Sequence, residues 1–380
     1  MEVRFVESIE KIGKEVWNSV VDTDYPFIQY EFLHLLESSG SVCSDSGWET
    51  CHIVVESGKK VVALAPCYIK HHGFGEYVFD YQWARAYQQL GFTYYPKLVT
   101  AIPFTPATGK RIYCCSEVNR AEVFNYIFEA VNKEIKLERF HSWHLLFESQ
   151  PLEKISDRLP LLKRTGIQYH WFNKGYNSFD DFLNDCRKKN RKNIKRERKK
   201  VVEQNLKIRR IHGHDVTEEM ASKLFDFYRL TYLKRSGHLG YLKKEFFTQL
   251  YSDLPGNTLL VAAERGKKLV AASLFFHDSD SLYGRYWGAL EEYDSLHFEL
   301  CYYQGIEFAI KNKLKKLDAG AQGEHKISRG FKPVMTSSFH HIGLECLQAP
   351  IAKFLREENR YLKAMSSQLE SRLPFKNENK

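Results

Sequence analysis

The sequence predicts an α/β (α+β) chain of two similar domains, each built on a mixed central sheet. The chain has 380 residues, which is more than a single hydrophobic core usually serves. Its composition, 43% hydrophobic and 14% aromatic, supplies apolar material for two cores and argues against disorder. A pair of similar strand–turn–strand segments, one in each half, supports the same division.

The two similar segments are Ile53–Ala65 and Val261–Ser273. Each reads as an apolar strand that ends in a charged residue, a Gly-Lys-Lys turn and a second apolar strand, which is the pattern of a β-hairpin. One hairpin is a common feature of proteins. Two matched hairpins in a chain of two-domain length predict a tandem duplication.

The order of elements around the second hairpin is that of the GNAT acyltransferase fold. Helices come first, followed by a central meander and then by a strand, a helix and a strand. The first half follows a similar order. Besides the hairpins, we expect helices at 9–21, 31–38, 179–205, 218–236 and 297–311, and strands at 143–147, 206–211, 281–287 and ending at Asp318.

The predicted boundary between the domains lies close to the start of the segment 164–175. Residues 1–165 are expected to form a first GNAT-like domain that binds the acceptor. Residues 166–380 are expected to form a second GNAT-like domain, which carries a basic helix and a candidate catalytic loop.

Charge and composition restrict the partners and the location. The formal net charge of +9 favours polyanionic partners such as RNA, phosphorylated intermediates or anionic lipid. No run approaches 18 apolar residues, and no export signal is evident. The eight cysteines form no CxxC pair, and the histidines lack metal-ligand spacing. We expect a cytoplasmic protein with reduced cysteines, no metal site and no membrane contact other than a peripheral one.

Titratable side chains are concentrated between glycines in the segment 317–333, directly after an apolar run. Lys326 is a candidate catalytic cation, and Glu324 and His325 are candidate proton acceptors. Arg329 and Lys332 are candidate substrate-binding residues. An acid, an imidazole and three cations in one loop can tune each other's protonation for amine chemistry. The alternative is a solvated polar loop.

Glu299 and Arg285 are further candidates in the second half. Glu299 either faces the loop at Glu324 and acts as a catalytic base, or pairs with Arg285, itself a candidate substrate-binding residue. The segment Gly288–Ser295 lies where GNAT enzymes bind a pyrophosphate group, yet it carries three carboxylates and no Gly-x-Gly. Coenzyme A in the usual pose is therefore disfavoured.

An aromatic region of the first half also contains charged residues. Glu76, Asp80 and Lys97 lie among aromatic side chains that include Tyr95. Aromatic faces combined with charges suit a groove for a sugar, a nucleobase or a peptide, so these four are assigned to substrate binding. The competing interpretation is an aromatic core.

The run from Arg187 to Lys200 is nearly continuous positive charge on a predicted helix. Such density repels itself unless a polyanion or solvent relieves it. Lys188, Lys189, Arg191 and Lys192 are therefore candidate nucleic-acid-binding residues. The alternative is a solvated basic helix that covers its domain.

Motifs along most of the chain resemble the FemAB-like family of peptidoglycan biosynthesis/recognition proteins and predicted N-acyltransferases. The resemblance implies two GNAT-like domains that transfer an amino acid from aminoacyl-tRNA to an amine of a peptidoglycan precursor. It also implies that Lys326 or Lys332 stabilises the oxyanion, and that the acceptor lies in a cleft between the domains. The motifs are 75–80, 94–98, 103–106, 284–288, 296–299, 301–304, 320–326 and 329–331.

Direct aminolysis needs a deprotonated amine, a nearby carbonyl and donors for the oxyanion, but no covalent nucleophile. Three functional classes follow: an aminoacyltransferase, a coenzyme A-dependent N-acetyltransferase, and a non-catalytic protein that recognises glycans or peptides. We expect an N-acyltransferase of the EC 2.3 class without a tightly bound cofactor. Its co-substrate would be aminoacyl-tRNA or acyl-CoA, and its acceptor a small-molecule or peptide amine.

Overall fold

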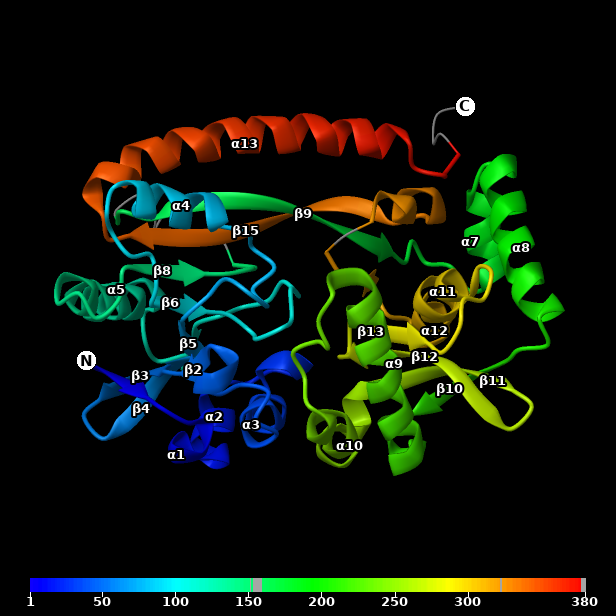
Figure 1. Cartoon of the computed structure of the whole chain (residues 1–380), viewed down its shortest axis with the longest axis horizontal. Coiled ribbons are helices and arrows are strands. Elements are labelled where there is room, and N and C mark those ends of the chain that lie inside the picture. The colour runs from blue at the N-terminus through cyan, green and yellow to red at the C-terminus, as the bar shows by residue number, and fades with distance from the viewer. Residues whose placement is uncertain (151, 153–158, 322, 377–380) are drawn as a thin grey trace. The chain divides into compact units, whose positions relative to one another are not determined.

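The computed structural model describes residues 1–150, 152, 159–321 and 323–376 (Figure 1). Contacts divide the chain into two compact units. Unit 1 comprises Met1–Gly166 and Met335–Ala364, and unit 2 comprises Ile167–Val334 and Met365–Lys380. The segment Met335–Ala364, which the sequence prediction placed in the second domain, therefore groups with unit 1.

Unit 1 contains two groups of strands. The first is an antiparallel sheet in the order β1 (Glu2–Val6), β3 (His52–Ser57), β4 (Lys60–Ala65) and β7 (Tyr113–Cys114). The second has the order β2 (Trp48–Thr50), β5 (Cys67–Lys70), β6 (Lys97–Thr100), β8 (Ser142–Leu145) and β15 (Lys332–Ile342), in which β6 and β8 are parallel. Pro66 separates β4 from β5, and a proline lacks the N–H that a continuous strand needs.

Helices cover the strands of unit 1. The longest wholly inside it, α5, begins after Asn119, whose side chain accepts hydrogen bonds from the first free N–H groups of the helix. Its buried residues recur at helical spacing, so one face packs into the core. The helices are α1 (Ile9–Ile12), α2 (Lys14–Val20), α3 (Tyr30–Ser38), α4 (Tyr81–Gln89), α5 (Arg120–Lys136) and the first part of α13 (Glu345–Ser371).

Unit 2 is built on one mixed sheet. Its order is β10 (Lys207–His212), β11 (Thr258–Arg265), β12 (Lys268–His277), β13 (Ser281–Ala289), β14 (Lys316–Asp318) and the end of β9 (Leu162–Phe172), and only β13 and β14 are parallel. Helix α9 lies against β13 and β12 (Figure 1). The helices are α7 (Phe179–Asp185), α8 (Lys188–Glu203), α9 (Glu218–Ser236), α10 (Lys244–Asp253), α11 (Leu296–Phe298) and α12 (Gln304–Lys311), with a π-helical segment at Glu299–Tyr303.

The two predicted hairpins are confirmed, and they match residue by residue. The β3–β4 register shifts after Val55 and the β11–β12 register shifts after Ala263, the corresponding position. A strand precedes each hairpin and pairs with it antiparallel. In both places an arginine of that strand forms an ion pair with the glutamate at the shift, Arg4 with Glu56 and Arg209 with Glu264.

The structure corrects one predicted element and adds others. The single helix predicted for 179–205 is two helices, because Cys186 and Arg187 are extended and Arg187 N–H bonds to the carbonyl of Pro374. Helices α4, α5, α10 and α13 had not been predicted. Among the described residues, no helix combines the length and the apolar character needed to cross a membrane.

A substitution at Gly288 tests how closely α9 packs against β13. A Cβ atom at this position would lie 2.1 Å from the carbonyl oxygen of Phe227, a backbone atom that cannot move without shifting the helix. We expect Gly288→Ala to lower the free energy of unfolding by about 1–3 kcal/mol, measured by urea denaturation. Gly256→Ala is the matched control, because nothing lies within 4 Å of its Cβ position. Equal midpoints for the two variants would contradict this packing.

Candidate functional site

In unit 2 the predicted loop begins at a buried ion pair. Asp318 ends β14, and its Oδ2 accepts a hydrogen bond of 3.0 Å from Arg285 of the adjacent strand β13. Its Oδ1 accepts a bond of 2.8 Å from the N–H of Gly320. Burial disfavours the charge on Asp318, but Arg285 and His170 hold its pKa well below the ordinary value. The carboxylate thus fixes the start of the loop.

Lys326 is buried beneath this loop, with a side chain directed at backbone oxygens. Its ammonium donates to the carbonyls of Ala319 at 2.7 Å and Gly320 at 3.0 Å. An ammonium has three N–H donors, and the described residues receive two of them. Burial lowers the pKa of Lys326 to about 8, although Asp318 favours its charged form. Lys326 is therefore a fixed cation whose charge is sensitive to pH.

Arg329 and His325 lie in the 3₁₀ turn η6 (Glu324–Arg329) of the same loop, and each contacts a residue outside it. Arg329 bonds to both oxygens of Glu197 from α8, and its guanidinium lies 3.5 Å from the ring centroid of Phe298. The Nε2 of His325 lies 2.9 Å from the hydroxyl of Tyr302. Burial and Arg329 lower the pKa of His325, so its imidazole is neutral near pH 7.

Glu299 does not pair with Arg285, and that part of the prediction is wrong. Both of its oxygens accept from Arg198 of α8, at 2.9 and 3.0 Å, and one also accepts from Gln304. The buried Arg285 bonds to Asp318 instead, because β14 lies parallel to β13 and brings Asp318 beside it. The π-helical turn that contains Glu299 directs it toward α8.

The other loop candidates are less buried than Lys326 and Arg329, and His325 and Glu324 are both exposed. Glu324 lies 3.4 Å from Arg372 in a surface ion pair, an interaction that contributes little to stability. Lys332 is half-buried at the start of β15. Of the five loop candidates, Lys326 and Arg329 are the two whose side chains are buried.

The segment Gly288–Ser295 is organised by packing and by an ion pair. Gly288 is needed for the close approach of α9 described above. Asp294 forms an ion pair of 2.7 Å with Lys200 of α8, and its N–H donates to Gln204, the residue that follows this helix. Glu291 and Glu292 are exposed. The three carboxylates of this turn, Glu291, Glu292 and Asp294, disfavour the binding of an anionic pyrophosphate group.

In unit 1 the structure brings together the four substrate-binding candidates. Lys97 is fully buried, and its ammonium donates to Glu76 at 2.8 Å and to Asp80. The same ammonium lies 5.5 Å from the ring centroid of Tyr95. Burial opposes the charge on Lys97, but the two carboxylates raise its pKa. Burial raises the pKa of Glu76 to about 7, although Lys97 counteracts it.

A second lysine, Lys70, was missed by the sequence analysis. It lies directly opposite Lys97 in the β5–β6 ladder, and both side chains are buried. Its ammonium donates to the carbonyl of Phe74 at 3.2 Å and lies 4.0 Å from the ring centroid of Trp48. Burial lowers the pKa of Lys70 to about 7. The only signal in the sequence is one charged residue at the end of an otherwise apolar strand.

Two histidines extend this cluster. Tyr94 donates to Asp80 and lies 3.2 Å from His144 Nε2, and His144 Nδ1 lies 2.6 Å from His340 Nδ1. Burial holds the pKa of both histidines well below the ordinary value. Both histidines are fully buried. In the described part of the chain, no three or more His, Cys, Asp or Glu side chains are arranged to hold a metal ion.

Two atoms in this region of unit 1, Glu76 Oε1 and His340 Nε2, are buried without a hydrogen-bond partner among the described residues. A buried acceptor that lacks a donor costs free energy. Such an atom commonly marks a position that a water molecule or a ligand occupies. We refer to Glu76, Asp80, Lys97 and Lys70 as the unit 1 charge cluster.

Most of the nucleic-acid candidates lie on the exposed face of helix α8. Lys188, Lys189 and Lys192 are exposed, whereas Arg191 is half-buried and bonds to Asn184 at 3.3 Å. The inner face carries Ile194 and Val201 together with the paired Glu197 and Arg198 described above. The exposed basic residues continue along the helix as Lys195, Arg196 and Lys199.

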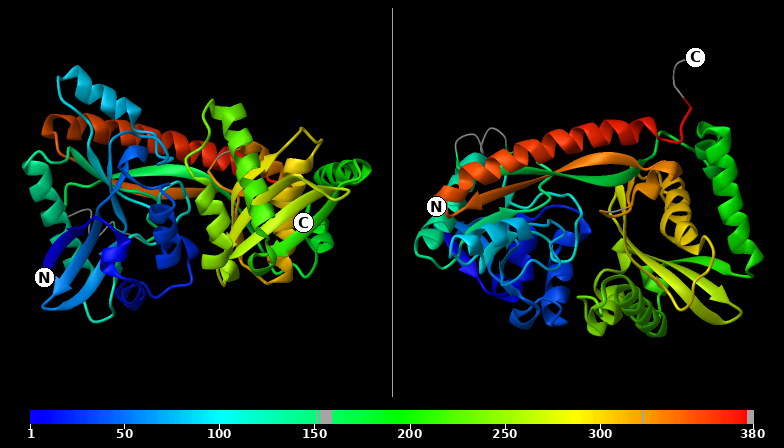
Figure 2. Two further views of the ribbon diagram at one scale, coloured as in Figure 1. Left: turned by 60° about the horizontal axis from the view of Figure 1, so that its bottom comes forward. Right: turned by 45° about the horizontal axis from the view of Figure 1, so that its top comes forward.

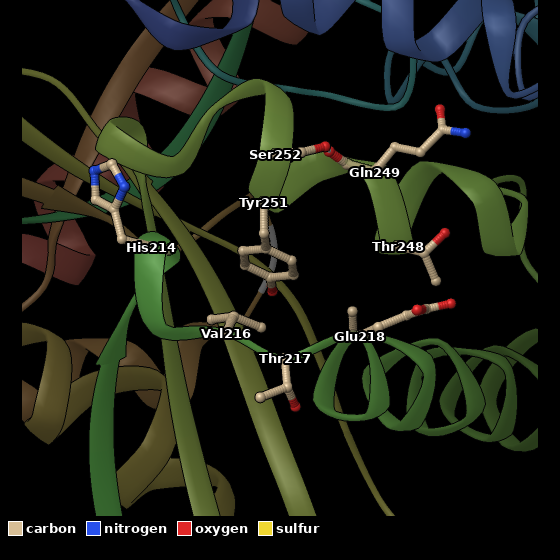
Figure 3. A pocket seen from close by; sticks show the side chains of 10 residues that line it. His214, Val216, Thr217, Glu218, Thr248, Gln249, Tyr251 and Ser252 are labelled. Atoms are coloured by element: carbon tan, nitrogen blue, oxygen red, sulfur yellow. The ribbon is translucent and has the colours of Figure 1, made fainter.

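A surface pocket of about 500 Å³ lies elsewhere in unit 2, between the start of α9 and helix α10 (Figure 3). Its labelled side chains are mostly polar, and the hydroxyl of Tyr251 is buried without a partner among the described residues. None of the predicted site residues lines it. The lining residues are Gly213, His214, Val216, Thr217, Glu218, Ala221, Thr248, Gln249, Tyr251 and Ser252.

Solved structures share the fold of this chain. FemX has a TM-score of 0.52 at 11% identity, covering 93% of this chain and 99% of that one. The C-terminal domain of a putative lysylphosphatidylglycerol synthetase from Agrobacterium fabrum has a TM-score of 0.54 at 9% identity, covering 92% and 97%. A conserved protein of unknown function from Bacteroides thetaiotaomicron has 0.51 at 12% identity, covering 90% and 99%. The chain therefore shares the fold of these proteins, a mixed α/β fold with mixed sheets, as the sequence predicted.

The family follows from the sequence. The FemAB-like family model, described as peptidoglycan biosynthesis/recognition, matches residues 8–377. The match spans nearly the whole chain, so the chain belongs to the FemAB-like family. A comparison with curated protein sequences finds no match.

The unit 1 charge cluster predicts a pH dependence of stability. Because the pKa of Glu76 is raised from 4.5 to about 7, the folded state holds a proton that the unfolded state releases between these values. The free energy of unfolding of the wild type should therefore fall relative to Glu76→Gln as the pH rises from about 4.5 to about 7, and the difference should be constant above that range. Urea denaturation at a series of pH values measures it.

Glu122→Gln, which changes an exposed carboxylate of α5, serves as the control and should follow the wild-type curve. Parallel curves for wild type and Glu76→Gln from pH 4.5 to pH 7 would show that Glu76 stays ionised in the folded protein.

Proposed function

We propose that this FemAB-like protein is an N-acyltransferase that transfers an aminoacyl group from aminoacyl-tRNA to an amine of a cell-wall precursor or peptide. The observation that carries the proposal is Lys326, a buried ammonium held by two carbonyls in a glycine-containing loop. A fixed cation with one remaining N–H donor suits the oxyanion of acyl transfer. The family description, peptidoglycan biosynthesis/recognition, supports an acceptor from the cell wall.

The reaction is direct aminolysis. The acceptor nitrogen attacks the ester carbonyl carbon, a C–N bond forms, and the negative charge gathers on the carbonyl oxygen. Lys326 donates to that oxygen. The ester C–O bond then breaks, the tRNA hydroxyl leaves with a proton, and the amide remains. No covalent intermediate with the protein is needed.

His325 is the better placed proton acceptor for the attacking amine. When its Nε2–H donates to the hydroxyl of Tyr302, Nδ1 is left as an acceptor, and the lowered pKa of the ring keeps it neutral. Glu324 is the alternative acceptor, and its carboxylate already pairs with Arg372 at the surface. Glu299 has both oxygens occupied by Arg198, so we assign it a positioning role.

The contacts of the remaining candidates in unit 2 suggest two different roles for them. Arg285 and Arg329 are held by Asp318 and Glu197, so they position the loop before any substrate arrives. Lys332 has no such burial and remains a proposed substrate-binding residue. We place the reaction in the cytoplasm, where aminoacyl-tRNA would be met.

We assign acceptor recognition to the unit 1 charge cluster and Tyr95. The unpartnered Oε1 of Glu76 can accept a hydrogen bond from an amine, an amide or a hydroxyl group of the acceptor. Tyr95 is half-buried beside it and offers a ring face. These features suit a peptide or a sugar, and a peptidoglycan precursor contains both.

Lys326 and Lys332 can be separated by substitution. We expect Lys326→Ala to lower the rate of transfer by about 10²–10³-fold, because an oxyanion donor is lost, and Lys332→Ala to change mainly the Michaelis constant. With a pKa of about 8, Lys326 loses its charge as the pH rises, so the wild-type rate should decline above that value. The measurement is steady-state transfer at a series of pH values, with circular dichroism as the control for folding. Unchanged turnover of Lys326→Ala would reject its role.

The donor is tested by the salt dependence of tRNA binding. Each phosphate contact contributes a slope of about −0.7 to −0.9 in log affinity against log salt. Changing Lys188, Lys189 and Lys192 to alanine should therefore flatten the slope by about 2–3. Changing Lys59, Lys133 and Lys136, which are exposed in unit 1, should leave it unchanged.

Arg191 is best changed separately, since its bond to Asn184 ties it to the protein. Calorimetry with acetyl-CoA accompanies the salt series. Micromolar binding of acetyl-CoA without salt-dependent binding of tRNA would reject the tRNA donor and favour a coenzyme A-dependent N-acetyltransferase. Binding of neither would favour a recognition protein.

A further inference from the structure

Exposed apolar side chains gather in one short segment of unit 1. Fourteen large hydrophobic residues are exposed among those described, and five of them lie between residues 74 and 92. A random distribution would place about one there. We call these five the aromatic rim: Phe74 (66% exposed), Phe79 (54%), Tyr81 (67%), Leu90 (50%) and Phe92 (53%). Clusters of this kind on a folded protein usually mark an interaction surface.

Four of the five residues of the aromatic rim lie at the ends of helix α4. Phe79 and Tyr81 lie at the start of the helix, with ring centroids 6.3 Å apart. Leu90 and Phe92 follow its end, about 13 Å along the axis. The left view of Figure 2 shows α4, in light blue, on the rim of unit 1. The helix thus presents apolar groups at both ends.

The opposite side of α4 is firmly attached, so the exposure of the rim is not a result of a loose helix. Trp83 and Tyr87 are buried against residues of α13. The hydroxyl of Tyr87 donates to the carbonyl of His141. Arg164 donates to the carbonyl of Phe79 at 2.8 Å and also bonds to Glu358 of α13. The rim is therefore displayed on a rigid support.

The rim segment itself has no exposed carboxylate, and two carboxylates of other elements that lie beside it are paired, Glu49 with His71 and Glu358 with Arg164. Between His71 and Lys97 the only carboxylates are Glu76 and Asp80, and both are buried against Lys97. Arg85 is exposed on the outer face of α4, one turn from Tyr81. The surface of this segment thus carries no exposed negative charge, and it complements an anionic partner.

We propose that the aromatic rim docks this protein onto the surface of an anionic lipid bilayer. Aromatic and leucine side chains insert at the boundary between head groups and acyl chains, and cations bind the anionic head groups. The polar residues between the two ends of the rim, Gln82, Gln88 and Gln89, stay hydrated among the head groups. In a protein–protein interface they would instead interrupt the dry centre, so the bilayer fits this surface better.

The docking is independent of the proposed transfer reaction, and its test needs no activity. The wild-type protein is sedimented with vesicles of phosphatidylcholine, with and without phosphatidylglycerol. The rim variant combines Phe74→Ser, Phe79→Ser and Phe92→Ser. We expect the wild type to bind, more tightly to the anionic vesicles, and the rim variant to bind at least about tenfold more weakly, since three exposed apolar anchors are lost.

The control variant combines Val202→Ser, Leu233→Ser and Tyr361→Ser, which removes the same number of exposed apolar side chains elsewhere. It should bind like the wild type. Thermal unfolding of both variants verifies that they fold.

Three results would overturn the proposal. The first is that the wild type binds neither kind of vesicle. The second is that the rim variant binds as well as the control, which would transfer any binding to another surface such as the basic face of α8. The third is a wild-type dimer, seen by analytical ultracentrifugation, that the rim substitutions dissolve, which would identify the rim as a contact between copies of this chain.

Discussion

A buried charge must be accompanied by its counter-charge, and this constraint shapes both units. In unit 1 the β5–β6 ladder sets Lys70 directly opposite Lys97, a placement in which two ammonium groups would repel. The chain resolves the conflict in two ways: Glu76 and Asp80 surround Lys97, and burial lowers the pKa of Lys70 to about 7. Both carboxylates lie in the connection between β5 and β6, which therefore has to pass close to Lys97.

The same constraint organises the loop of unit 2, but here the buried charge is a carboxylate and its partner is a cation. Here the carboxylate of Asp318 comes at the end of a strand, and Arg285 on the neighbouring strand neutralises it. With Asp318 fixed, the N–H of Gly320 is held and two carbonyls turn toward Lys326. Gly323, at φ 113°, would place a Cβ 2.6 Å from the ring of His325. Glycine is thus required where backbone and imidazole meet.

Local patterns in the sequence were sufficient for the features that depend on neighbours in the chain. The Gly-Lys-Lys turns located both hairpins, and the clustering of charge around Lys326 located the loop. The break between α7 and α8 was not predictable, because it depends on a contact between Arg187 and Pro374. The partners of Glu299 and His340 were missed for the same reason: Arg198 and His144 lie far away in the sequence.

The two units diverge directly after their matched hairpins. Position 66 is a proline and ends β4, whereas the corresponding Leu274 lies inside the unbroken strand β12. After the strand, unit 2 returns through the short turn Asp278–Asp280, but unit 1 inserts residues 71–96. That one insertion carries Glu76, Asp80, helix α4 and the aromatic rim. Both the acceptor site proposed here and the proposed lipid contact therefore arise from a single connection, while the paired strands on either side retain the plan shared by the two halves.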